Sequence, residues 1–269
     1  MTKTQANIAA ALLILALVAA PWLFPGIVSW FVVVICMAAF LLVLGALISK
    51  RPLGVLVNEQ NLMSLSRFQM VIWTIIILSA YFVIAIGRIS GGTPDALAIK
   101  IDWRLWALMG ISATSLVGTP LINSTKKQRP AADSETEKAA NALMEAKNAP
   151  DSIPFADRTD PAKMKSIVKD MSQGILYANP TIADASFADM FEGDEVGNTA
   201  YLDLAKVQMF YFTVILGVAY VATLVPSLAR LRTDPASVGE LPALSEGMVA
   251  LLGISHAGFL ASKGVDHTK

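Results

Sequence analysis

One stretch of the chain occurs twice, and this duplication constrains the fold more than any other feature. Gln, Met, Thr, Ala and Tyr recur in the same order in residues 69–81 and 208–220, at a constant offset of 139 positions. Both copies lie in apolar runs close to the roughly 20 residues that a helix needs to cross a bilayer. A second shared motif, Leu-x-Gly-Ile-Ser, begins at Leu108 and again at Leu251. The repeated unit is therefore predicted to be a hairpin of two membrane helices.

Composition supports a membrane protein. Of the 269 residues, 55% are hydrophobic and 16% are charged, whereas soluble domains carry about 25% charged residues. Lys and Arg together equal Asp and Glu, with 21 residues each, so no basic excess points to nucleic acid. The single cysteine, Cys36, excludes an intrachain disulfide and any site built from several cysteines.

The apolar runs predict an all-α integral membrane protein with six transmembrane helices. The second helix follows the first almost at once, so the first run is read as a helix of the protein and not as a cleaved signal sequence. The predicted spans are residues 7–24, 27–48, 68–87, 105–122, 207–225 and 244–261.

Domain organisation follows from these spans. Residues 1–50 form an N-terminal hairpin, residues 51–122 and 191–269 form the two repeat units with their lead-in segments, and residues 123–190 form a hydrophilic insert. Within the insert, helices are predicted at residues 133–147 and 161–173, because the first is rich in Ala and charge and the second begins with Pro.

Orientation is predicted from the basic residues that flank the spans. Ten of them, including Lys50, Lys126 and Lys206, fall on one side, and five, including Arg88 and Arg104, fall on the other. By the positive-inside rule both termini and the insert are cytoplasmic. An even number of spans separates the copies, so the repeat is parallel, with a pseudo-two-fold axis along the membrane normal.

Polar residues recur at membrane depth in the predicted spans. Two interpretations remain open: they are packing contacts between helices, or they line a permeation path. His256 has the further alternatives of a proton or metal role or a hydrogen bond to a neighbouring helix. No Asp, Glu, Lys or Arg lies in the interior of a span, because Glu246 stands at the beginning of the last one, and this disfavours ion-coupled transport. The candidates are Gln69, Thr74, Tyr81, Ser112, Gln208, Thr213, Tyr220, Ser255 and His256.

Small residues four apart mark the second helix of each hairpin. Such spacing lets helices approach closely in lipid, where it supports packing and self-association. These candidate packing residues are Gly110, Thr114 and Gly118 in the first copy, and Gly253, Ala257 and Ala261 in the second.

The lead-in to the second copy is acidic. Asp189, Glu192, Asp194 and Glu195 lie close together around glycines, and three interpretations remain open. They form a solvated acidic surface, chelate a divalent cation through carboxylate oxygens, or dock against basic residues such as Lys126-Lys127 and Arg129. No other cofactor is expected.

Two sets of residues resemble bacterial inner-membrane proteins of unassigned function. One is Ser66-Arg67-Phe68-Gln69 followed by Trp73-Thr74, and the other is Gly253-Ile254-Ser255 followed by Phe259-Leu260 and Lys263. The related pattern has Tyr where this chain has Phe259, and the second copy replaces Ser-Arg with Ala205-Lys206. The resemblance covers the hairpins and implies a bacterial inner membrane, but it implies no activity.

No motif for a nucleophile elbow, a phosphate loop or a zinc protease occurs in the chain, so a non-enzymatic role is expected. The sequence predicts an oligomeric, channel-like assembly that is gated or signalled through its insert. The alternative is a membrane scaffold that recruits a cytoplasmic partner or joins a larger membrane complex. The expected partners are therefore the lipid bilayer, further copies of the chain and a cytoplasmic protein.

Overall fold

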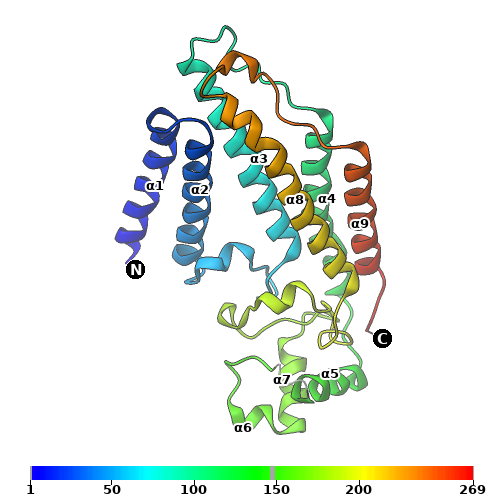
Figure 1. Ribbon diagram of the computed structural model, residues 1–269. Helices are drawn as coiled ribbons and strands as arrows, with labels where there is room; N and C mark the ends of the chain where they lie inside the picture. The colour runs from blue at the N-terminus through cyan, green and yellow to red at the C-terminus, as the bar shows by residue number, and fades with distance from the viewer. Residues whose placement is uncertain (1, 146–148, 269) are drawn as a thin grey trace. The chain divides into compact units, whose positions relative to one another are not determined.

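The computed structural model describes residues 2–145 and 149–268, and its regular structure is helical. Within that part of the chain, β-pairing is limited to isolated bridges. Short 3-10 helices occur at Pro52–Leu56, Ile182–Asp184, Phe187–Met190 and Pro235–Ser237. The α-helices, labelled in Figure 1, are α1 (Lys3–Leu23), α2 (Gly26–Ile48), α3 (Leu65–Ser90), α4 (Trp103–Lys126), α5 (Asp133–Glu145), α6 (Phe155–Arg158), α7 (Pro161–Met171), α8 (Leu204–Arg230) and α9 (Glu246–Gly264).

Five of these helices, α1, α2, α3, α4 and α8, are long and apolar enough to cross a membrane. Helix α9 covers the sixth predicted span but is not among them. It begins at Glu246, carries Lys263 near its end and holds Ser255 and His256 in between, and these polar residues lower its hydropathy. The apolar helices are typical of a multi-pass membrane protein, while the sixth span stays a prediction.

The helices of the repeat are longer than the predicted spans. Helix α3 begins at Leu65 and α8 begins at Leu204, which keeps the offset of 139 positions at the first residue of each helix. Both helices continue past the predicted apolar spans, to Ser90 and Arg230. The helical conformation therefore extends beyond the part of each helix that is apolar enough for lipid.

Local sequence signals account for several helix ends. Thr2 and Gln5 form a reciprocal capping box at the start of α1. Asp160 accepts hydrogen bonds from the backbone at the start of α7, where Pro161 occupies the first helical position. After α3, Gly92 has a φ of +66°, a left-handed conformation that glycine adopts without a steric cost.

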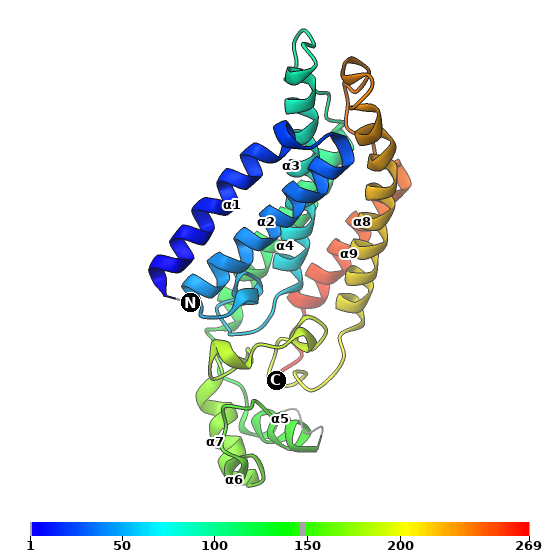
Figure 2. The ribbon, with the colours of Figure 1, turned by 60° about the vertical axis from the view of Figure 1, so that its left-hand side comes forward.

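The chain divides into two compact units, and unit 1 contains Met1–Val55, Phe68–Ala113 and Tyr211–Gly253. Helices α1 and α2 lie side by side and antiparallel in this unit (Figure 2). One hydrophobic cluster joins residues of α2, α3, α4, α8 and α9, including Trp30, Trp73 and Leu224. Many large apolar side chains of α1 and α2 remain exposed, as expected of helix surfaces that face lipid.

Two connections of unit 1 pair with each other. Lys100 donates its backbone N–H to Gly239 O at 2.9 Å and accepts from Leu241 N–H at 3.0 Å. The buried guanidinium of Arg88 donates to Ala96 O at 3.1 Å and to Val238 O at 3.0 Å. The loop after α3 and the loop after α8, which follow equivalent helices of the repeat, are thereby held together.

Unit 2 contains Leu56–Arg67, Thr114–Phe210 and Ile254–Lys269. Its small hydrophobic core is built mainly from α5 and α7, with Ala140, Leu143, Met164 and Val168 all buried. The predicted helix 133–147 corresponds to α5, which is described as far as Glu145, and residues 146–147 lie outside the described residues. The predicted helix 161–173 corresponds to α7, which ends two residues earlier.

Candidate functional site

The polar residues of the repeated helices differ between the two copies. In unit 1, Gln69 donates from Nε2 to the hydroxyl of Thr213, and both side chains are fully buried. Their counterparts are less buried, because Thr74 is half-buried and Gln208 is exposed. Within unit 1, a side chain of the first copy therefore binds a side chain of the second.

The two tyrosines of the repeat also lie in different surroundings. Tyr220 is buried against Trp73, with ring centroids 6.3 Å apart, and its hydroxyl has no hydrogen-bond partner among the described residues. Tyr81 is half-buried, and its hydroxyl lies 3.5 Å from Leu97 O. Only the second copy therefore places its tyrosine in the core of unit 1.

The serines and the histidine predicted at membrane depth are buried. Ser112 in unit 1 and Ser255 in unit 2 each have a hydroxyl with no hydrogen-bond partner in the described part of the chain. In unit 2, His256 Nδ1 lies 2.6 Å from the hydroxyl of Ser115. Ser115 was not among the residues that the repeat marked, although it follows Ser112 by three positions and so shares its side of α4.

A serine within hydrogen-bond distance of an imidazole is the first geometric requirement for a nucleophile and its base. Catalysis also needs access for substrate and a group that orients the imidazole. Ser115 and His256 are both almost fully buried, and the described contacts supply no carboxylate beside the imidazole. The geometry supports a polar contact between α4 and α9 within unit 2.

The small residues are placed mostly on exposed helix faces. Gly110, Thr114, Ala257 and Ala261 are exposed in the single chain. A Cβ built on Gly110 would meet no neighbouring atom within 4 Å, whereas one on Gly118 would lie 3.3 Å from the Leu260 side chain. A Cβ on Gly253 would lie 3.9 Å from Ile111, an ordinary contact distance.

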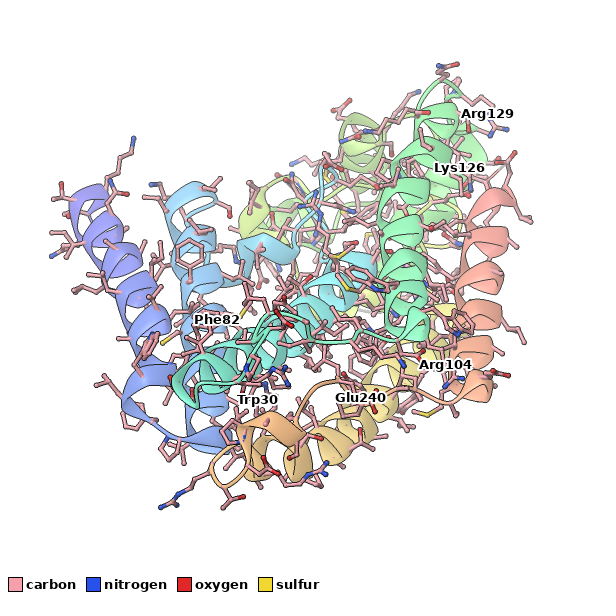
Figure 3. All side chains as sticks on the ribbon, turned by 90° about the horizontal axis from the view of Figure 1, so that it is seen from above. Trp30, Phe82, Arg104, Lys126, Arg129 and Glu240 are labelled. Carbon is pink, nitrogen blue, oxygen red and sulfur yellow. The ribbon has the colours of Figure 1, made fainter. Side chains whose placement is uncertain are left out.

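Glu195 is the centre of a buried charge cluster in unit 2. One carboxylate oxygen accepts from Lys126 Nζ at 2.5 Å, and the other accepts from the backbone N–H groups of His267 at 2.8 Å and Thr268 at 2.7 Å. Lys126 also donates to Val265 O at 2.9 Å. Figure 3 shows Lys126 at the opposite end of α4 from Arg104. The end of α4, the acidic lead-in and the segment after α9 thus share one buried ion pair.

Asp194 lies between two buried lysines. It accepts from Lys206 Nζ at 2.8 Å and from Lys263 Nζ. Burial alone raises the pKa of Asp194, but the charges and hydrogen bonds of the two lysines outweigh it and hold this pKa below its ordinary value. Asp194 is therefore a carboxylate that stays ionised in the interior of unit 2.

Asp189 is buried without a direct ion pair. Its Oδ2 accepts from the backbone N–H of Met63 at 2.9 Å and of Ser186 at 2.8 Å. Burial raises the pKa of Asp189 to about 6, and the hydrogen bonds from Ser186 and Met63 oppose that shift only in part. The sequence did not distinguish this carboxyl from its neighbours.

The four candidate metal ligands are distributed over several separate contacts. The carboxylates of Glu195 and Asp194 accept hydrogen bonds from lysines, and that of Asp189 accepts from backbone N–H groups. Glu192 accepts from Lys206 through its backbone carbonyl, at 2.5 Å. No group of three or more His, Cys, Asp or Glu residues suited to a metal occurs among residues 2–145 and 149–268. The Lys126–Glu195 contact corresponds to one of the three interpretations of the acidic lead-in, docking against basic residues. Arg129 also pairs with Asp266 on the surface, at 2.5 and 2.9 Å.

Comparison with known proteins gives no match to this chain. No family of known proteins, no curated protein and no solved structure is significantly similar to it.

Proposed function

We propose that this chain is a non-enzymatic scaffold of the bacterial inner membrane that holds a folded cytoplasmic module for a protein partner. In this proposal all six predicted spans cross the bilayer, the repeat is parallel, and both termini and the insert are cytoplasmic. The five apolar helices and the asymmetry of the flanking basic residues support this arrangement.

The observation that carries the proposal is the buried charge cluster of unit 2. Two carboxylates of the acidic lead-in, Asp189 and Glu195, are buried and hydrogen-bonded, and the side chain of Asp194, which pairs with Lys206, is only 15% exposed. Breaking a buried pair by removing one partner is strongly destabilising, because the other charge is left without compensation. Such pairs favour one conformation of the lead-in, which suits a module that is presented in a fixed arrangement.

The module has a surface suited to protein binding. Beyond its own core, Phe155 at the start of α6 is 78% exposed, and aromatic residues are enriched where proteins bind each other. Phe187 is also exposed and packs against Phe191 with ring centroids 5.3 Å apart. These residues are the first candidates for partner contact.

Site-specific photocrosslinking in intact cells tests this proposal. A photoreactive amino acid at Phe155 is expected to give one recurring adduct with a cytoplasmic protein, and deletion of residues 130–189 should abolish it. The matched control is Asp151, which is fully exposed in the same module and should not give that adduct. Adducts with other copies of the chain alone would contradict a cytoplasmic partner.

A pore formed by several copies is the second candidate function, and the exposed small residues of α4 favour it. Gly110 and Thr114 are exposed residues of α4, and small residues support helix association in lipid. Gly110→Leu should lower the oligomer mass measured in detergent without unfolding the monomer. Ion flux into liposomes, lost together with the oligomer, would favour the pore, and an impermeable wild-type preparation would rule it out.

A further inference from the structure

A cavity of 370 Å³ lies in unit 1 at the turn between α1 and α2, the turn visible in Figure 2. Its walls come from the end of α1, the start of α2, the end of α3 and the residues that follow α8. This volume is within the range of small-molecule sites. Neither the predicted pore nor the proposed scaffold uses this cavity.

Ser29 in the first turn of α2 gives the cavity a buried polar group. The side chain is 1% exposed, and its hydroxyl has no hydrogen-bond partner in the described part of the chain. A buried hydroxyl without a partner is costly, so each such group needs an explanation. Because Ser29 lines the cavity, a bound molecule would satisfy its hydroxyl.

The start of α2 adds backbone donors beside Ser29. Pro25 occupies the N-cap position, and no side chain caps this helix. The first N–H groups of a helix lack the usual partners four residues earlier and carry a partial positive charge, which favours an anion. In α2 the N–H of Val28 donates to Pro25 O at 3.2 Å, so the donors that remain to be considered are those of Gly26 and Ile27. Gly26 fixes this end against α8, since a Cβ there would lie 2.5 Å from Leu228 O.

At the ends of α3 and α8 beside the cavity, several carbonyl groups are already engaged. The carbonyl of Gly87 in the last turn of α3 accepts from Gly91 N–H at 3.0 Å. In the last turn of α8, Ser227 O and Ala229 O accept from Leu231 and Arg232 N–H at 3.2 and 3.4 Å. These three carbonyl groups, which would otherwise attract a cation, are therefore already hydrogen-bonded to the following chain.

Arg232 is the charged residue of the lining, which contains no acidic side chain. Its guanidinium is exposed, and no carboxylate among the described residues forms an ion pair with it. A guanidinium, a hydroxyl and a helix N-terminus together match the oxygens of a phosphate group. Without a carboxylate, the cavity offers no counter-charge to the ammonium of a zwitterionic headgroup.

The rim of the cavity indicates where such a phosphate comes from. Trp22, Leu23 and Phe24 are exposed at the end of α1, and aromatic residues concentrate at the level of lipid headgroups. Helices α1, α2, α3 and α8, whose ends surround the cavity, are all long and apolar enough to cross a membrane. We propose that this cavity binds the phosphate of an anionic phospholipid, through Ser29, the first turn of α2 and Arg232.

Native mass spectrometry of the purified full-length protein tests this site. After delipidation, the protein is titrated with phosphatidylglycerol, phosphatidylcholine or inorganic phosphate. Phosphatidylglycerol should bind at least several-fold more tightly than phosphatidylcholine. Arg232→Ala should weaken its binding about tenfold or more, and Ser29→Ala about threefold to tenfold.

Arg230→Ala is the matched control, because Arg230 is exposed at the same end of α8 but does not line the cavity. An equal loss in Arg230→Ala and Arg232→Ala would show a non-specific charge effect and overturn the proposal. Binding of inorganic phosphate without a preference for phosphatidylglycerol would overturn the lipid assignment. If Arg232→Ala elutes as a misfolded species, Arg232→Gln is measured in its place, and unchanged lipid affinity in a folded variant would overturn the site.

Discussion

The first residues of α3 and α8 show how the two copies of the repeat differ. Arg67 pairs with Glu59 at 2.9 Å, with 34% and 67% of the two side chains exposed. Lys206 occupies the equivalent place in the second copy and pairs with Asp194, with only 5% and 15% exposed. The helical start is thus maintained while the electrostatic environment changes from a surface pair to an interior cluster.

The same difference continues one turn into each helix. Gln69 is buried and binds Thr213, whereas Gln208 is exposed. A duplicated sequence therefore does not imply a duplicated role. The lead-in of the second copy belongs to the core of unit 2, and the amide of the first copy belongs to the core of unit 1.

The largest expected effect is the difference in stability lost when each of the two ion pairs at the helix starts is broken. Asp194→Asn leaves Lys206 and Lys263 buried without their carboxylate, so it should lower the free energy of unfolding by about 3–5 kcal/mol. Glu59→Gln removes an exposed partner and should cost about 1 kcal/mol or less. Unfolding in mixed micelles at increasing denaturing detergent measures both. Equal losses would remove the distinction between the copies.

The second prediction concerns pH and the acidic lead-in. The pKa of Asp189 is raised to about 6 in the folded state from an ordinary value of 3.8. The folded state then binds the proton more tightly between these values, so stability should fall as pH rises from about 4 to about 6, by at most about 3 kcal/mol. Thermal unfolding across this range measures the slope.

Asp189→Asn is the control for this slope, because an amide oxygen still accepts from Met63 and Ser186 but does not titrate. In this variant the stability should depend less on pH between pH 4 and 6, whereas in Arg67→Ala the pH dependence should remain. Asp194 acts in the opposite direction, since its pKa lies below the ordinary value. The stabilisation that ionised Asp194 gives the folded state is present above about pH 4 and is lost as the pH falls further. An unchanged slope in Asp189→Asn would contradict the assignment.

A smaller effect is expected for the repeated glutamines. Gln69→Ala removes a buried hydrogen bond to Thr213 and should lower the free energy of unfolding by about 1 kcal/mol, a typical value for polar contacts between membrane helices. Gln208→Ala acts on an exposed side chain and should have no effect above about 0.5 kcal/mol. If both variants lose the same stability, Gln208 has a buried contact that the single chain does not contain.

The smallest effect is expected at the equivalent glycines of the two hairpins. Gly110→Ala and Gly253→Ala introduce a methyl group where the nearest atoms are beyond 4 Å and at 3.9 Å. Each should be neutral or should stabilise its helix by up to about 1 kcal/mol, because alanine has the higher helix propensity. Thermal unfolding of both variants checks this. A clear loss in Gly110→Ala alone would indicate close contact with a neighbouring copy.

The sequence predicted the helices of the repeat well, because their apolar runs and the fixed offset are local signals. Helix α3 contains the predicted span 68–87, and α8 contains 207–225. The sequence left the contact of Glu195 with Lys126 as one of three interpretations, since an acidic run has the same local pattern on a surface and in a buried cluster. The pairing depends on residues 69 positions apart in the chain, which only the folded structure brings together.

The contact between Ser115 and His256 was unpredictable for a related reason. The two residues belong to different helices and do not occupy matching positions of the two hairpins. The repeated motif made Ser112 and Ser255 the candidate polar residues, but their hydroxyls have no hydrogen-bond partner among the described residues. Duplication identified the helices that carry polar groups, but the contacts between those groups depend on how α4 and α9 pack in unit 2.

The position of Glu195 also determines the order of events during synthesis. This carboxylate accepts hydrogen bonds from Lys126, which is synthesised before it. It also accepts from the backbone N–H groups of His267 and Thr268, which are synthesised after α9. While the ribosome is still producing α9, Glu195 therefore lacks two of its donors and Lys126 lacks the carbonyl of Val265. The charge cluster can therefore close only after the residues that follow α9 have been synthesised, so this part of unit 2 forms late.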